Sequence, residues 1–223
     1  MNQINQTNQL EKPKLRGVIH LVMSPISLVA GLVMISAASE LRGRITLGIF
    51  TLTAVTLFTC SALYHRVNWS NKYRGLWRRI DHANIPILIA GTYTPFAVFL
   101  LNPNQRNILL TAVWIGALST SFMRIVWLSA PRWLYVAAYI LLGWAALAFI
   151  PTFYKNGGIA VFSLIVLGGL CYTAGGVVYA LKKPNFNLNW FGFHELFHAL
   201  TAAAFVCHFV AAVLTVFGSG GRI

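Results

Sequence analysis

Acidic residues are nearly missing from this chain of 223 residues, which contains four Asp and Glu against 17 Lys and Arg. Charged residues of all kinds make up only 9% of the sequence, whereas a soluble domain has about 25%. A chain with so few charged side chains cannot cover a water-facing surface, and 57% of its residues are hydrophobic. We therefore interpret it as an integral membrane protein.

Cysteine is also scarce. Cys60, Cys171 and Cys207 are odd in number and widely spaced, which argues against a disulfide framework. All three fall inside apolar stretches, where a free cysteine packs as a small hydrophobic side chain. The sequence therefore predicts a fold held together by helix packing and not by covalent cross-links.

Long apolar runs are abundant, and each transmembrane helix needs about 20 of their residues. Short breaks rich in Gly, Pro, Asn and basic residues separate seven such runs, at 17–38, 45–64, 80–101, 108–128, 133–149, 159–181 and 193–217. We expect an all-α membrane protein with seven transmembrane helices in a single domain of residues 17–217. A short polar and basic tail of residues 1–16 precedes this domain, and residues 218–223 form a short tail after it.

The basic residues favour one side of the membrane. When the seven spans alternate in direction, twelve of the 17 Lys and Arg lie on the N-terminal side and five on the other. This excess predicts a cytoplasmic N-terminus and, after seven spans, a C-terminus outside a plasma or inner membrane. The same placement accounts for the net charge of +13, so we expect no nucleic-acid partner.

Four ionisable side chains converge on this predicted topology. His65 ends the second span, Asp81 begins the third, and His194 and His198 begin the seventh. All four therefore lie at one depth near the cytoplasmic face. Ionisable residues within membrane segments are rare and usually functional, so the convergence predicts a site.

His194 and His198 suit a metal ion, because residues four apart share one helix face and lie about 6 Å apart along the axis. His65 would complete a three-histidine site whose fourth position is open to water, as in catalytic zinc sites. Asp81 would orient that water or take its proton. The alternatives are an N-cap role for Asp81 and a headgroup contact for His65.

Glu195 lies between the two histidines and completes the motif His194-Glu195-Leu196-Phe197-His198. The pattern His-Glu-x-x-His is typical of zinc metalloproteases, in which the glutamate is the general base. Glu195 points about 100° away from His194. It could therefore complement the helix N-terminus, pair with a basic loop, or act as the base of an intramembrane protease.

The chain resembles the hemolysin III branch of the progestin and adipoQ receptor superfamily, which includes the adiponectin receptors. The resemblance covers residues 15–217 and rests on three motifs, which are Ser61-Ala62-Leu63-Tyr64-His65, Asp81-His82 followed by Gly91-Thr92-Tyr93-Thr94-Pro95, and His194-Glu195-Leu196-Phe197-His198. It implies zinc bound by His65, His194 and His198. It further implies that Asp81 contacts the water of the site and that Ser61 is a hydrogen-bonding neighbour.

The superfamily is similar to the alkaline ceramidases, which implies a zinc-dependent hydrolase acting on a lipid amide or ester. The alternative is a non-enzymatic membrane sensor, or a cytolytic protein as the family name implies, with structural zinc. One departure concerns the first span, because many members carry an acid and an Asn before its histidine, and here no acid precedes His20. This departure puts a role for the first span in doubt, although His20 could lie near the site.

The last two spans are rich in small residues, which let helices approach closely in lipid. Gly168-Gly169 and Gly175-Gly176 lie in the sixth span, and the seventh is rich in alanine. We expect close packing of these helices, or a thin seventh helix surrounded by the others. His208 lies on the same face as His194, about 21 Å further along, and either makes one internal hydrogen bond or lines a polar path.

Overall fold

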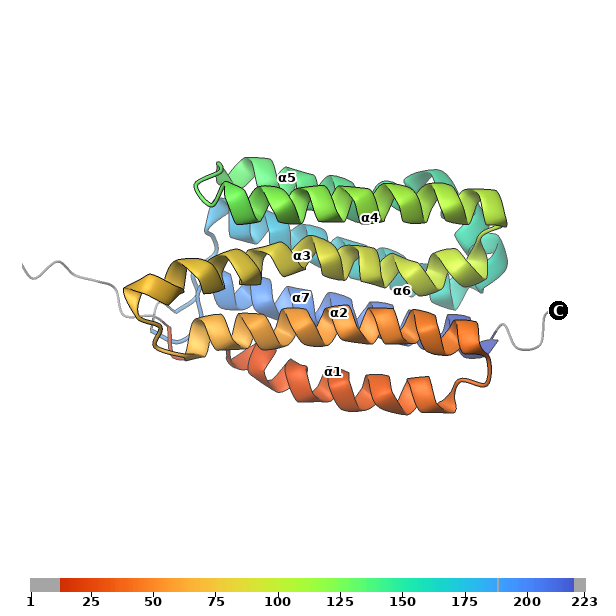
Figure 1. Cartoon of the computed structure of the whole chain (residues 1–223), viewed down its shortest axis with the longest axis horizontal. Helices are drawn as coiled ribbons and strands as arrows, with labels where there is room; N and C mark the ends of the chain where they lie inside the picture. The colour runs from red at the N-terminus through yellow and green to blue at the C-terminus, as the bar shows by residue number, and fades with distance from the viewer. Residues whose placement is uncertain (1–12, 188, 219–223) are drawn as a thin grey trace, which may run out of the picture.

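The computed structural model describes residues 13–187 and 189–218, which form a bundle of helices with axes along one common direction (Figure 1). Within these ranges there is no β-strand, so the predicted all-α fold is confirmed. The elements in chain order are α1 (Val18–Ala37), α2 (Leu41–Arg66), α3 (Asn71–Leu100), α4 (Pro103–Val126), α5 (Arg132–Gly143), the 3₁₀ helix η1 (Ala145–Phe149), α6 (Ile150–Leu181) and α7 (Phe193–Gly218).

Six helical segments of the described chain are long and apolar enough to cross a membrane. Five of them are α1, α2, α3, α4 and α7, and the sixth is the continuous stretch Arg132–Leu181, which contains α5, η1 and α6. A multi-pass membrane protein is thereby confirmed. The predicted count of seven spans depends on how the sixth stretch, of 50 residues, is divided.

The chain reverses inside α6 at Gly158, whose φ of 73° and ψ of 176° are not helical. Contacts on the two sides of this residue are antiparallel. Trp144 donates a hydrogen bond from Nε1 to Thr173 Oγ1 at 2.9 Å, and Arg132 donates from Nη1 to the Tyr179 carbonyl at 3.0 Å. Residues 132–144 therefore lie beside residues 173–179, and Gly158 supplies the backbone conformation that the turn requires.

Two predicted segments differ from the observed elements. α3 begins at Asn71, although the predicted span starts at residue 80, because hydropathy detects only the apolar part of a helix while Lys and Arg continue it readily. The segment 133–149 is not one α-helix, since α5 ends at Gly143 and η1 follows. The Gly143 carbonyl accepts a hydrogen bond of 2.5 Å from the Tyr93 hydroxyl at this change of helix type.

α3 is the most buried of the candidate spans, with 67% of its most apolar stretch buried against 44% for α7. α3, which lies between α2 and α4 in Figure 1, is therefore more deeply buried than α7, the helix expected to be surrounded by the others. The predicted close packing of α6 on α7 is present. A Cβ at Gly168 would lie 2.3 Å from the His208 ring, and one at Gly175 would lie 3.4 Å from Phe197.

Candidate metal centre

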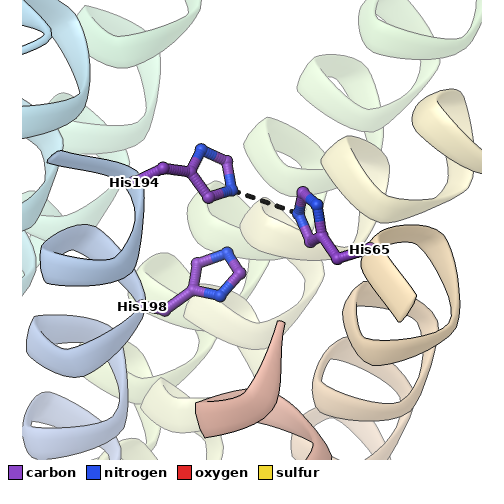
Figure 2. A group of neighbouring side chains, drawn as sticks. All are labelled: His65, His194 and His198. Atoms are coloured by element: carbon purple, nitrogen blue, oxygen red, sulfur yellow. Dashed lines mark hydrogen bonds between the residues drawn. The ribbon is translucent and has the colours of Figure 1, made fainter. Parts of the chain in front are cut away.

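Three histidines meet at one end of the bundle, His65 from the last turn of α2 and His194 and His198 from the first turns of α7 (Figure 2). The start of α7 is fixed by acceptors for its first N–H groups. Glu195 accepts the Gly192 N–H at 2.8 Å, which is the backbone half of a capping box, and Asn185 Oδ1 accepts the Phe193 N–H at 2.9 Å.

The three imidazoles point toward one another (Figure 2). The Nε2 atoms of His65 and His194 are 3.1 Å apart, and one potential ligand atom from each of the three residues lies within 4.8 Å of the others. The ring centroids of His194 and His198 are 4.6 Å apart, and those of His65 and His198 are 5.1 Å apart. The structure therefore brings together the three residues that the sequence predicted as metal ligands.

The donor set fits a metal ion such as zinc. Nitrogen ligands at about 2.0–2.1 Å from a tetrahedral zinc lie about 3.3 Å from one another, close to the spacing of the His65 and His194 nitrogens. His198 Nδ1 is buried and has no hydrogen-bond partner among the described residues. Because buried polar atoms are nearly always satisfied, a cluster of three imidazoles with such an atom is suited to coordination.

Asp81 lies beside this cluster, with Oδ2 3.9 Å from His65 Nε2 and 3.9 Å from His82 Nε2. Ser61, one turn before His65 on α2, is a hydrogen-bond partner of the Asp81 side chain. The N-cap alternative for Asp81 is wrong, because α3 begins at Asn71 and Asp81 is in the helix interior. Both predicted catalytic residues are thus buried, Asp81 beside the histidines and Ser61 beside Asp81, and their roles stay predictions.

α1 contributes to the site, contrary to the doubt raised by its missing acid. The His20 ring stacks on the His198 ring with centroids 3.8 Å apart and an angle of 7° between the planes. Gly17, at φ 77°, lies so close to α2 that a Cβ there would be 2.6 Å from His65 Cβ. A histidine in an apolar run was the only sequence signal for this contact, since the distance between helices is set by tertiary packing.

Arg124 is a site neighbour that the sequence did not reveal. It lies near the end of the predicted span 108–128 and was counted with the basic residues of the N-terminal side, yet it is fully buried at 0% exposure. Its Nη2 donates to His82 Nδ1 at 2.6 Å, and its guanidinium lies 4.0 Å from the centre of the Tyr135 ring. Since arginine can only donate, His82 Nδ1 is the acceptor and its proton is on Nε2, the nitrogen nearer Asp81.

Glu195 has both carboxylate oxygens engaged. Oε1 forms an ion pair with Arg16, and Oε2 accepts the Gly192 N–H. Two of the predicted roles, complementing the helix start and pairing with a basic segment, are therefore both present. A carboxylate held in this way is not placed as a general base, so the protease alternative lacks its central residue.

A cavity of about 140 Å³ adjoins the histidines inside the bundle. Its wall includes Asp81, His194 and His198, and most of the remaining lining is aliphatic or aromatic, from α3, α5 and α6. The cavity reaches His208 on α7, where His208 Nε2 makes one hydrogen bond of 3.0 Å to the Ile165 carbonyl. The expected internal hydrogen bond of His208 is therefore present, and the cavity that His208 lines is largely apolar, unlike the polar path of the alternative.

The fold and the site define a class: a multi-pass helical membrane protein with a cluster of three histidines, two of which lie with a buried carboxylate at the wall of a largely apolar cavity. The family model described as Haemolysin-III related matches residues 8–209, nearly the whole chain. The chain therefore belongs to the haemolysin III–related family, as its motifs indicated.

Curated relatives agree with this assignment. The chain is 32% identical over 163 residues to the Hemolysin-3 homolog of Bacillus subtilis (strain 168), covering 71% of this chain and 73% of the relative. It is 28% identical over 184 residues to Hemolysin-3 of Bacillus cereus, covering 81% of each. The Adiponectin receptor protein of Drosophila melanogaster is 25% identical over 192 residues, which cover 78% of this chain and 43% of the receptor.

Proposed function

We propose that the chain crosses the membrane seven times with its N-terminus in the cytoplasm. A straight helix of 50 residues would be about 75 Å long, more than twice the roughly 30 Å of a bilayer core. The antiparallel contacts around Gly158 support two crossings within Arg132–Leu181. The start of α1 and the end of α7 lie at opposite ends of the bundle (Figure 1), as an odd number of crossings requires.

The proposed orientation still rests on charge. When Arg124 is left out of the count because it is buried, eleven basic residues remain on the N-terminal side against five on the other. The basic residues are still in excess on the N-terminal side, so they continue to favour a cytoplasmic N-terminus. The histidine cluster would then lie near the cytoplasmic face.

Within this topology we infer a zinc-dependent hydrolase that acts on a lipid amide or ester. The observation that carries the inference is the convergence of His65, His194, His198 and Asp81, of which His194, His198 and Asp81 lie at the wall of a largely apolar cavity. A purely structural metal site does not require an adjoining cavity, and a cavity that only binds an apolar chain does not require a buried carboxylate. Together they suit a substrate that has an apolar chain and a hydrolysable polar linkage.

Each residue has a distinct role in the proposed reaction. The three histidines would hold zinc, which when bound supplies a Lewis acid and a water of lowered pKa. Asp81 would accept a proton from the attacking water and return it to the leaving group. Ser61, as hydrogen-bond partner of Asp81, would orient that carboxylate, and the apolar wall would align the lipid chain and exclude bulk water.

The alternative is a non-enzymatic sensor or cytolytic protein in which zinc is structural. It is supported by the placement of the cluster, because a metal at His65 and His194 would join α2 to α7 at one end of the bundle. The names of the relatives, Hemolysin-3 and Adiponectin receptor protein, are compatible with it. The hydrolase requires Asp81 as a proton acceptor, whereas a protein with structural zinc does not require this carboxylate for its function.

The test measures zinc and turnover in the same purified preparations. Elemental analysis of wild-type protein is expected to give about one zinc per chain, His198→Ala is expected to lose it, and His208→Gln is the matched histidine control that retains it. Asp81→Asn is expected to keep zinc and to lose at least about 100-fold in the cleavage of lipid amides or esters. If zinc-loaded wild-type protein cleaves no lipid amide or ester of the panel, the hydrolase is refuted and the structural role of zinc is the remaining function.

A further inference from the structure

Glu195 is the one acidic side chain of the His-Glu-x-x-His motif, and the proposed hydrolysis does not use it. Glu195 is only 1% exposed to solvent. Its partners are the Arg16 guanidinium, which comes from the segment before α1, and the Gly192 N–H at the start of α7. A buried carboxylate with such partners ties two distant parts of the chain together.

Residues 13–17, which we call the strap, run alongside the segment that leads into α7. The Lys14 N–H donates to the Asn189 carbonyl at 2.9 Å, and the Leu15 N–H donates to the Trp190 carbonyl at 3.3 Å. The Lys14 ammonium lies 4.5 Å from the centre of the Trp190 ring. The strap is therefore paired to a loop, and Arg16 supplies its ion pair to the helix that carries two of the histidines.

The C-terminal end of the strap rests on the histidine cluster itself. Gly17 packs against His65, at a distance that leaves no room for a side chain. Three residues later, His20 covers one face of the His198 ring. The strap and the first turn of α1 thus touch two of the three candidate metal ligands from one side.

We propose that the strap closes the end of the bundle over the metal site, and that the Arg16–Glu195 ion pair is the latch that sets how fast a divalent cation enters and leaves. This inference rests on the proposed metal site. It gives Glu195 a positioning role in place of the base that its motif suggested. Opening would require the ion pair to separate, which is costly because Glu195, whose side chain is fully buried while that of Arg16 is partly exposed, would keep an uncompensated charge.

The test is the rate of zinc loss from loaded full-length protein in detergent after mixing with excess chelating dye. Glu195→Gln and Arg16→Gln both break the latch but change the local charge in opposite directions. A latch predicts that both variants release zinc faster, by about tenfold or more. Simple electrostatics predicts opposite effects, since losing a negative charge weakens cation binding and losing a positive charge strengthens it.

The matched control is Arg42→Gln, which breaks the Glu40–Arg42 ion pair at the turn between α1 and α2, away from the histidines. It is expected to release zinc at the wild-type rate. Arg16→Gln keeps the Glu195 cap on α7 intact, so it tests the strap even where Glu195→Gln weakens folding.

Release at the wild-type rate in Arg16→Gln, or opposite effects in the two single variants, would overturn the latch. In that case zinc would leave through the internal cavity, whose wall also includes His194 and His198. If the wild-type protein binds zinc and both variants release it at the wild-type rate, the metal site is retained and only the role of the strap is refuted. Wild-type protein that binds no zinc overturns both proposals.

Discussion

Replacement of Gly17 by alanine tests whether the contact between the start of α1 and His65 positions the metal ligands. Gly17 has a φ of 77°, in the left-handed region, and its position allows no Cβ without contact. The new methyl group would lie 2.6 Å from His65 Cβ, whereas ordinary contacts begin near 3.4 Å. His65 or α1 must therefore move by about 0.8 Å.

Two effects follow, and their sizes differ. The left-handed backbone costs an alanine about 1–2 kcal/mol, which lowers the free energy of unfolding. The displacement acts on the metal, because ligand distances must hold within about 0.2 Å and the forced shift is several times larger. We expect zinc affinity to fall about 10–100-fold, the usual effect of disturbing a group that orients a metal ligand.

The assay is competition for zinc with a chelator of known affinity, together with thermal unfolding in detergent. Gly158→Ala is the control for backbone strain, because Gly158 also has a positive φ, 73°, with a ψ of 176° that suits alanine no better, but nothing lies within 4 Å of its Cβ position. Both variants are expected to lose stability, and only Gly17→Ala is expected to lose zinc affinity. A folded Gly17→Ala protein with wild-type affinity would refute the reasoning.

Three further predictions concern stability, measured by thermal unfolding. His82→Leu removes a hydrogen-bond partner of the buried Arg124 and is expected to cost about 2 kcal/mol, whereas adding Arg124→Leu should recover part of the loss; additive effects would contradict the coupling. Gly168→Ala forces the His208 ring away from α6 and should destabilise, while the neighbouring Gly169→Ala, with 3.9 Å of clearance, should be neutral or stabilising by up to about 1 kcal/mol. Removing zinc with a chelator should lower the unfolding temperature, and free zinc at about 100 times its dissociation constant should restore about 2.7 kcal/mol.

Hydropathy located the membrane helices because burial in lipid demands continuous apolar residues, and this demand is local to each segment. It failed at α3, where the helix runs past the apolar part through Lys72, Arg74, Arg78 and Arg79. It also counted Arg124, near the end of the predicted span 108–128, as a charge of the cytoplasmic side, since an arginine at such a place looks the same whether it leaves the bilayer or turns inward. The partner that accounts for its inward position, His82, is 42 residues away.

The three-histidine cluster followed from the sequence because alternating helices fix the end of the bundle at which each residue lies, and i, i+4 spacing fixes a shared face. Depth alone does not determine which helices are neighbours. For that reason the contact of His20 with His198, and the approach of Gly17 to His65, emerged only from the packed structure.

Glu195 illustrates the difference between what the sequence determines and what only the tertiary structure decides. The sequence by itself determined an all-α membrane protein and the residues that gather at one end, because hydrophobic length and helical periodicity are properties of short segments. Only the tertiary structure decided that Glu195 faces Arg16 and the start of α7, that Asp81 is interior to its helix, and that Arg124 is buried. A side chain's role depends on its partners, and those partners are brought together by packing between segments far apart in the chain.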